Sequence, residues 1–441
     1  CTGLTNVTLN DTVTSIGTWA FNNCYATTTF AGTPTITSIG SQSFYNYKNS
    51  AITIPSSVTS IGSSAFYGSS LTSIVIPSNV KTINSGAFQS CTALTSITLE
   101  EGVQTIGPSA FNGCGKVTSI TIPKSVTSIG SSAFNGCSAL VTVYYSGTMA
   151  QWCSVSFGGY WLNKSVNLYV NGSKVTELSI PTTITNIPAY AFNYCTSITS
   201  VTVPSNITTI GTGAFNKCSS IASMTLPFTP TYVSSIFGGS SYSNNTSYVP
   251  ASLKTVVITG GTSISNYAFY GCSNITSLTL PNTVTTIGDY AFQDCSNITT
   301  FVVPDSVTSI GLGAFKGCSK LENLTIPFVG KSNDATAYEA VLGYIFGYET
   351  TVRSGSSSST TTAEDSSSTS FTNTQYSSVS GATWQYSCYN SLGTYYAYSS
   401  SYSYTIAYGY RLQSYYYYIP TSLKNVTVTG TKVSNYAFFN C

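Results

Sequence analysis

The thirteen cysteines of this 441-residue chain are the side chains most capable of chemistry. Thiolates are nucleophiles and metal ligands, and thiols pair as disulfides in an oxidising compartment. The chain has no histidine, however, and no two of its cysteines form a Cys-x2-Cys pair. Ser-His-Asp catalysis, Cys-His catalysis and the usual zinc sites are therefore not expected.

Most of the cysteines follow a regular spacing that indicates a structural role. Ten of them lie three residues after a phenylalanine, namely Cys24, Cys91, Cys114, Cys137, Cys195, Cys218, Cys272, Cys295, Cys318 and Cys441. Cys1 stands in the same register, but the positions that follow Phe44 and Phe66 hold Tyr47 and Ser69. Since a disulfide partner would not be so replaceable, we expect a ladder of buried thiols that pack as small apolar side chains, with disulfides as the alternative.

Carboxylates offer another route to catalysis, because a glycosidase needs only two that converge. Glu100, Glu101, Asp289, Asp294 and Asp305 fall at positions where the repeat described below varies. We expect these side chains to be solvated. The sequence has no nucleophile elbow, phosphate-binding loop or calcium-loop spacing, so it predicts no enzyme activity and no cofactor.

A first aromatic cluster lies between residues 144 and 172. Trp152, Tyr160 and Trp161 could stack on a sugar ring, or the two tryptophans could seal a break in the repeat. Cys153 follows Trp152 and lies outside the cysteine spacing, so it is either incidental or exposed and reactive.

A second aromatic group lies in a tract rich in serine, threonine and tyrosine at about 350–418. Tyrosine supplies rigid contact area and serine supplies adaptable hydrogen bonds, so this tract is either a recognition surface or a flexible loop. It also contains Cys388, the other cysteine outside the spacing. The candidate ligand-binding side chains here are Tyr395, Tyr396, Tyr402 and Tyr404.

Composition narrows the class of partner. The chain carries 15 Lys and Arg against 13 Asp and Glu, a net charge of +2, which argues against binding to nucleic acid. Hydrophobic residues make up 42% of the chain, enough for a large core. No apolar run approaches the length of a membrane helix, so we expect no membrane insertion in this segment.

A repeat positions all of these residues. Ala-Phe pairs recur along the chain, with uninterrupted steps of 22 or 23 residues from Phe66 to Phe134. Within one repeat, Ile120-Thr121-Ile122 alternates as a short strand does, and Val126 to Gly130 is a second extended stretch. A short helical turn is expected at Ala133-Phe134. Since one repeat cannot bury its own apolar face, the repeats must stack as a solenoid.

These residues resemble the bacterial BspA-type leucine-rich repeat, which has the same Ile-Pro, Ile-Gly and Ala-Phe-x-x-Cys signature. Here the signature appears as Ile122-Pro123, Ile129-Gly130 and Ala133-Phe134 followed by Cys137. The resemblance covers nearly all of residues 1–330 and returns at 419–441. The structural repeat positions are Phe66, Phe88, Cys91, Phe111, Cys114, Phe134, Cys137, Phe192, Cys195, Phe215, Cys218, Phe269, Cys272, Phe292, Cys295, Phe315 and Cys318.

The resemblance implies a β-rich α/β fold: a right-handed, curved solenoid with one short β-strand per coil and extended, 3-10 or short helical segments opposite. It also implies a secreted or surface-displayed protein that adheres to an extracellular protein or glycan ligand. We expect a monomer without enzyme activity. The alternative is a structural spacer that displays another domain.

The repeat is interrupted three times. We expect repeats at 1–140, 181–227 and 261–327, insertions at 141–180, 228–260 and 328–418, and a partial repeat at 419–441, all within one continuous solenoid. The second and third insertions share the segments Pro-Phe, Ile-Phe-Gly and Ser-Leu-Lys, so they are copies of one excursion that differ mainly in loop length.

Overall fold

The computed structural model describes residues 3–335, 337–353, 382–389, 395–396, 412–433 and 437–438. Tyr402, Tyr404, Cys1 and Cys441 lie outside these residues. The chain forms two compact units, each a β-solenoid. The N-terminal unit comprises Cys1–Met224, Ser234–Ser240 and Pro250–Ser252, and the C-terminal unit comprises Thr225–Val233, Ser241–Val249 and Leu253–Cys441.

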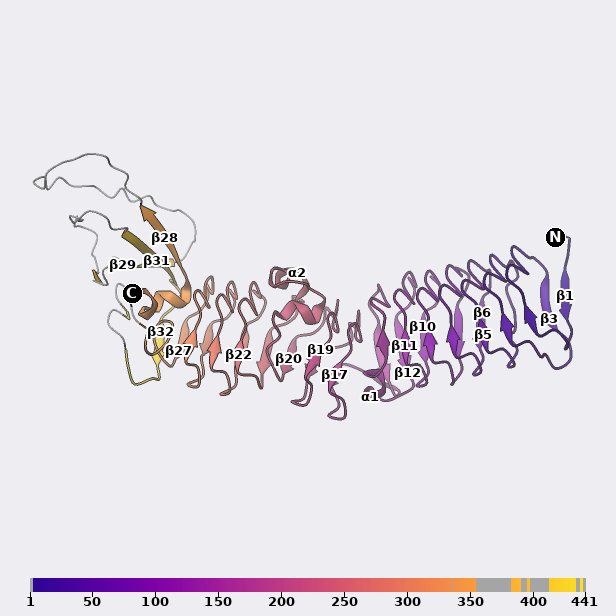
Figure 1. Ribbon diagram of the computed structural model, residues 1–441, viewed down its shortest axis with the longest axis horizontal. Coiled ribbons are helices and arrows are strands. Elements are labelled where there is room, and N and C mark those ends of the chain that lie inside the picture. Colours follow the sequence, from indigo (N-terminus) through magenta and orange to yellow (C-terminus); the bar gives the residue numbers. More distant parts are fainter. Residues whose placement is uncertain are drawn as a thin grey trace, which may run out of the picture. The chain divides into compact units, whose positions relative to one another are not determined.

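The longer strands of the N-terminal unit pair in parallel and run side by side (Figure 1). Their side chains alternate between solvent and core, as the Ser-Ile-Thr-Ile pattern predicts. They are β1 (Asn6–Leu9), β3 (Thr27–Phe30), β6 (Ser73–Ile76), β8 (Ser96–Leu99), β10 (Ser119–Ile122), β12 (Thr142–Tyr145), β14 (Asn167–Val170), β16 (Glu177–Ser179) and β18 (Ser200–Thr202). A two-residue strand, β15 (Ser173–Lys174), pairs antiparallel with β14. The strand that follows β18 and β19 in the chain is β20 (Ser223–Leu226).

Each regular coil has a second, shorter strand, so the coils carry two strands where one was expected. Seven of these short strands form one parallel sheet in the order β13-β11-β9-β7-β5-β4-β2. They are β2 (Ser15–Ile16), β4 (Ser38–Ile39), β5 (Ser60–Ile61), β7 (Thr82–Ile83), β9 (Thr105–Ile106), β11 (Ser128–Ile129) and β13 (Ser156–Phe157). The next two, β17 (Asn186–Ile187) and β19 (Thr209–Ile210), form a separate sheet.

Hydrogen-bonded turns form the third side of each coil. Between consecutive regular coils, the amide of the motif phenylalanine donates to the alanine carbonyl of the next coil, as Phe66 does to Ala87 (2.7 Å) and Phe88 to Ala110 (2.8 Å). No helix forms at these positions in the described part of the chain. The described helices lie in the interruptions instead: α1 (Met149–Trp152), η1 (Val233–Phe237), η2 (Tyr242–Asn244), α2 (Asn245–Tyr248), η3 (Ala337–Ala340) and η4 (Leu342–Phe346).

The C-terminal unit repeats this plan. Its longer strands are β21 (Thr255–Ile258), β23 (Ser277–Thr279), β25 (Thr300–Val302), β27 (Asn323–Ile326) and β32 (Asn425–Val428), and its shorter ones are β22 (Ser263–Ile264), β24 (Thr286–Ile287) and β26 (Ser309–Ile310). β32 pairs directly with β27, so the chain between them leaves the solenoid and returns. That excursion contains an antiparallel sheet in which β31 (Leu412–Pro420) lies between β28 (Tyr348–Arg353) and β29 (Ala382–Tyr389), with β30 (Tyr395–Tyr396) on β29.

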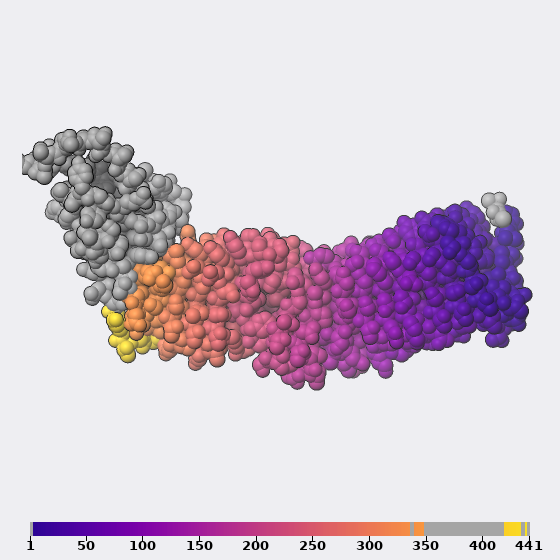
Figure 2. Space-filling view, in the orientation of Figure 1, coloured from indigo at the N-terminus to yellow at the C-terminus, as the bar shows by residue number. Residues whose placement is uncertain are grey.

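Stacked phenylalanines form the centre of the core. In the N-terminal unit the ring of Phe44 lies 5.0 Å from that of Phe66 at an interplanar angle of 3°, and the stack continues through Phe88 and Phe111 to Phe134. Stacked rings bury large apolar areas and add roughly 0.5–1.5 kcal/mol per pair. Side chains fill the space between successive coils (Figure 2). Each of these coils thus contributes one ring to a continuous stack along the core.

Candidate functional site

The cysteine ladder has the geometry of a packing device. The ten cysteines whose side chains the structure describes are free thiols, and all except Cys24 are buried. The thiol of Cys137 donates to the carbonyl of Phe111 in the preceding coil (3.2 Å), and Cys318 does the same to Phe292 (3.3 Å). Burial raises the pKa of Cys137, and that of Cys153, to about 12. Such thiols stay protonated and are poor nucleophiles.

The carboxylates hold neighbouring coils together. Glu100 accepts from the amide of Ser78 (3.0 Å), and Asp289 accepts from the amide of Leu312 (2.8 Å). Among the residues that the structure describes, no three Cys, Asp or Glu side chains gather where they could hold a metal ion.

The first insertion places Trp152 and Trp161 in the core. Both side chains are fully buried, and their rings lie 5.8 Å apart in an edge-to-face contact. Trp161 also meets Phe134 edge to face, which ends the phenylalanine stack. A buried indole offers no face to a sugar, so the expectation that these two tryptophans bind a ligand is corrected. They close the core of the solenoid where the repeat is interrupted. Tyr160, 43% exposed, packs on Tyr190 at 4.8 Å.

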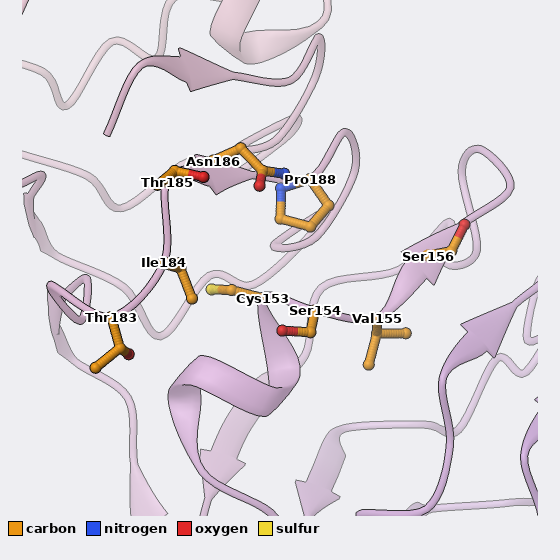
Figure 3. Close-up of a pocket in the computed structure, with 9 residues that line it drawn as sticks. All are labelled: Cys153, Ser154, Val155, Ser156, Thr183, Ile184, Thr185, Asn186 and Pro188. Atoms are coloured by element: carbon orange, nitrogen blue, oxygen red, sulfur yellow. The ribbon is translucent and has the colours of Figure 1, made fainter. Parts of the chain in front are cut away.

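A pocket of about 450 Å³ opens beside this insertion (Figure 3). Residues 153–156, which run from the end of α1 into β13, line one wall, and residues 183–186 with Pro188 line the other. The pocket therefore lies between β13 and β17, where the sheet of short strands is interrupted. Its lining contains hydroxyl, amide, aliphatic and thiol groups and no charged side chain.

A proline stands where the short-strand sheet is interrupted. After most short strands of the described chain, the next residue is a glycine whose amide donates to the carbonyl of the previous coil, as Gly107 does to Ile83 (2.7 Å). Where this residue is Asn84, its side-chain amide donates to Ile61 instead (2.6 Å). The equivalent residue after β17 is Pro188, which has no amide hydrogen and no side-chain donor. This hydrogen bond cannot form at Pro188, and the sheet of short strands ends between β13 and β17, where the sheet of longer strands also ends, between β14 and β16.

The C-terminal unit carries a column of stacked tyrosines at its surface. Tyr242, 41% exposed, stacks on Tyr267 at 4.3 Å, and Tyr267 stacks on Tyr290 at 5.3 Å. Tyr270 meets Tyr242 edge to face at 5.3 Å. Desolvation raises the pKa of Tyr267, and the nearby charge of Asp289 adds to this. These four residues are called the tyrosine column below.

Two members of the tyrosine column have a strained backbone. Tyr267 and Tyr290, each directly before an Ala-Phe pair, have φ angles of 58° and 54°. This left-handed region is unfavourable for bulky residues. In other coils the same position holds Ser109, Ser132 or Gly313, also with positive φ. The coil therefore needs the backbone conformation but not the tyrosine ring.

A smaller aromatic strip lies at the start of the N-terminal unit. Trp19 packs on Tyr45 at 5.4 Å, and Tyr45 stacks on Tyr67 at 4.8 Å.

Sequence analysis did not select the tyrosine column or the pocket. The motif Tyr-Ala-Phe at 267–269 and 290–292 would have predicted two tyrosines in register, one coil apart, and the structure shows both half-buried. Of the predicted tyrosines, Tyr395 and Tyr396 form β30, and Tyr402 and Tyr404 lie outside the described residues.

Comparison with known proteins identifies the repeat. The family model "BspA type Leucine rich repeat region" matches in six copies over residues 1–71, 59–168, 165–257 and 241–341. A search of the curated proteins found no match. No helix within the described residues is both long enough and apolar enough to span a membrane.

Solved leucine-rich repeat structures are similar to this chain. A leucine-rich repeat protein from Bacteroides ovatus is 24% identical over 73% of this chain and 79% of its own, with a TM-score of 0.48. A leucine rich cell surface protein from Faecalibacterium prausnitzii is 29% identical over 73% and 78%, with a TM-score of 0.34. The pneumococcal vaccine antigen PcpA is 18% identical over 73% and 62%, with a TM-score of 0.26.

Proposed function

This chain belongs to the BspA-type leucine-rich repeat family. On that premise, we propose that it is a non-enzymatic binding protein that a microbe secretes or displays on its cell surface. It adheres there to an extracellular protein or glycan. A solenoid suits this role because each coil presents the same surface positions, so contacts along the coils add up.

The tyrosine column is the observation that carries this proposal. Three stacked rings, those of Tyr242, Tyr267 and Tyr290, present a rigid aromatic surface that loses little conformational entropy on binding. Tyr267 and Tyr290 occupy positions where serine or glycine suffices elsewhere, at the expense of a strained backbone. Because the coil does not need a tyrosine at this position, the stacked aromatic surface supports a role in recognition.

The test is binding of the purified chain to arrays of extracellular-matrix proteins and glycans. We expect the double variant Tyr267→Ser and Tyr290→Ser to bind its ligand at least tenfold more weakly. Tyr25→Ser is the matched control, because Tyr25 is also an exposed tyrosine of a regular coil but stands outside the tyrosine column.

A variant that lacks residues 350–418 separates the remaining possibilities. Binding that is lost only with this deletion would assign recognition to the tract rich in serine and tyrosine. If the unaltered chain bound nothing on the arrays, the spacer alternative would replace the binding function.

A further inference from the structure

We propose that the pocket between β13 and β17 binds an extended peptide of a partner protein, which adds to β13 as a parallel strand. The site is separate from the tyrosine column, and it arises where the solenoid's own sheet of short strands is interrupted.

The outward edge of β13 has the hydrogen-bonding groups for such a strand. Its inward edge is paired: the amides of Ser156 and Gly158 donate to Thr127 and Ile129 of the preceding coil, both at 2.9 Å. In a β-strand, the backbone hydrogen-bonding groups of successive residues point to opposite edges of the strand. The carbonyls of Val155 and Phe157 and the amide of Phe157 therefore face the pocket, and no hydrogen bond satisfies them within the described part of the chain.

The opposite wall is also an unpaired strand edge. The carbonyls of Thr185 and Ile187 accept from the following coil, from the amides of Thr208 and Gly211 at 2.8 Å each. The amides of Thr185 and Asn186 point back toward the pocket, and among the described residues they have no acceptor. In a regular coil such amides would pair with the preceding short strand, as the amide of Thr127 does with Gln104 (2.8 Å). Pro188 prevents that closure, so both edges stay open.

The side chains of the pocket define the class of peptide. Ile184 is only half-buried, whereas Val103 and Val126 at the same repeat position are buried. It lies across from Cys153 and forms an apolar spot (Figure 3). Ser154 and Ser156 are polar but uncharged, and so are the three exposed residues of the other wall, Thr183, Thr185 and Asn186. The pocket thus fits an uncharged segment with one aliphatic side chain directed inward and small polar neighbours.

The chemistry is that of β-strand addition, in which main-chain hydrogen bonds supply affinity and alternate side chains supply specificity. The segment of this chain that pairs with β13 is Val-Thr-Ser-Ile-Gly at 126–130, which contains β11. A peptide of this type carries Val126 at the repeat position of Ile184, for the apolar spot, followed by the small polar residues Thr127 and Ser128, and it serves as the probe.

The test uses a fluorescein-labelled peptide that copies residues 125–131, titrated with the full chain and followed by fluorescence anisotropy. Methylation of the peptide nitrogens that correspond to Ser128 and Gly130 removes the donors to Val155 and Phe157. We expect this to weaken binding at least tenfold, while the same two methyl groups at the terminal serines, 125 and 131, leave it within about twofold.

The variant Thr185→Trp tests the location of the site, because the indole fills the pocket. The control is Thr208→Trp, at the equivalent exposed position one coil later, where the strands are paired. We expect only the first to abolish binding, with thermal melts reporting that both variants fold. Hydrogen exchange on the unaltered chain should show the amides of Phe157, Thr185 and Asn186 protected by the peptide. Binding that tolerates Thr185→Trp or methylation at both donors, or no binding at millimolar peptide, overturns the proposal.

Discussion

The indole nitrogen of Trp152 donates a hydrogen bond to the carbonyl oxygen of Ala191 at 3.2 Å. In a regular coil that carbonyl accepts from the amide of the motif phenylalanine in the preceding coil, as Ala110 does from Phe88. The first insertion displaces that backbone donor. Trp161 donates to the carbonyl of Tyr190 at 3.1 Å, which also accepts from the amide of Asn193 in its own coil. The side chain of Trp152 thus replaces one donor of the backbone ladder where the repeat is interrupted.

Replacing Trp152 by phenylalanine should therefore destabilise the chain. The change leaves the carbonyl of Ala191 buried without a donor and opens a small cavity. Together these effects cost about 2–4 kcal/mol. Urea unfolding followed by circular dichroism measures the difference. Trp19→Phe, at a 45% exposed tryptophan, should change stability by less than about 0.5 kcal/mol, and an equal loss in both variants would contradict the sealing role.

The glycine after each short strand should matter only where a coil lies behind it. A Cβ atom on Gly107 would come within 2.7 Å of the carbonyl oxygen of Ile83, whereas one on Gly17 would meet no atom within 4 Å. Neither glycine has a positive φ, so the difference is steric. We expect Gly107→Ala to cost about 1–3 kcal/mol and Gly17→Ala to be nearly neutral. Thermal unfolding of the two variants compares them directly.

A buried pair of asparagines should stabilise the coils beside the first insertion. The side-chain amide of Asn216 donates to Asn193 (2.7 Å), and that of Asn193 donates to the carbonyl of Leu162 (2.8 Å). Asn193→Ala removes both bonds and leaves a buried carbonyl unpaired, which costs about 2–3 kcal/mol. Asn112→Ala changes the same repeat position where it is only half-buried. If chemical denaturation gave the same loss for both variants, the pair would have no special role.

The repeat itself was readable because it depends on local pattern. Ile120 and Ile122 alternate with polar residues, and β10 covers Ser119–Ile122. The stretch from Val126 to Gly130 was predicted as extended, and β11 lies within it. The expected helical turn at Ala133-Phe134 is wrong, since hydrogen bonds between coils hold these residues as a turn.

The sites were less readable because they depend on contacts between distant residues. The partner of Trp152 is 39 residues away, and nothing in the insertion announces it. Pro188 lacks the donor that Gly107 and Asn84 supply to the previous coil. That difference is seen only when the three positions are compared in space. Tyr242 joins the tyrosine column from η2, outside the repeat register.

The thiol ladder makes the stability of the chain sensitive to alkaline pH. The pKa of Cys137, like that of Cys153, is about 12 in the folded chain because burial disfavours the thiolate, against 9.0 when the thiol is exposed by unfolding. Below pH 9 both states keep the proton, so the contribution of these thiols is constant. Between pH 9 and 12 only the unfolded chain loses its protons, which favours unfolding. Each thiol should lower the free energy of unfolding by about 2 kcal/mol at roughly pH 10.5.

The double variant Cys137→Ser and Cys153→Ser tests this dependence, because serine does not titrate and already holds the ladder position at Ser69. Urea unfolding of both proteins from pH 7 to about 10.5 gives the comparison. The variant starts from a lower stability but should lose less of it as the pH rises, so the gap between the two proteins narrows by up to about 4 kcal/mol. Other titrating groups, tyrosines included, are common to both proteins and cancel in the difference. A gap that stays constant over this range would mean that the two thiols ionise alike in the folded and unfolded chains, and that burial does not hold them protonated.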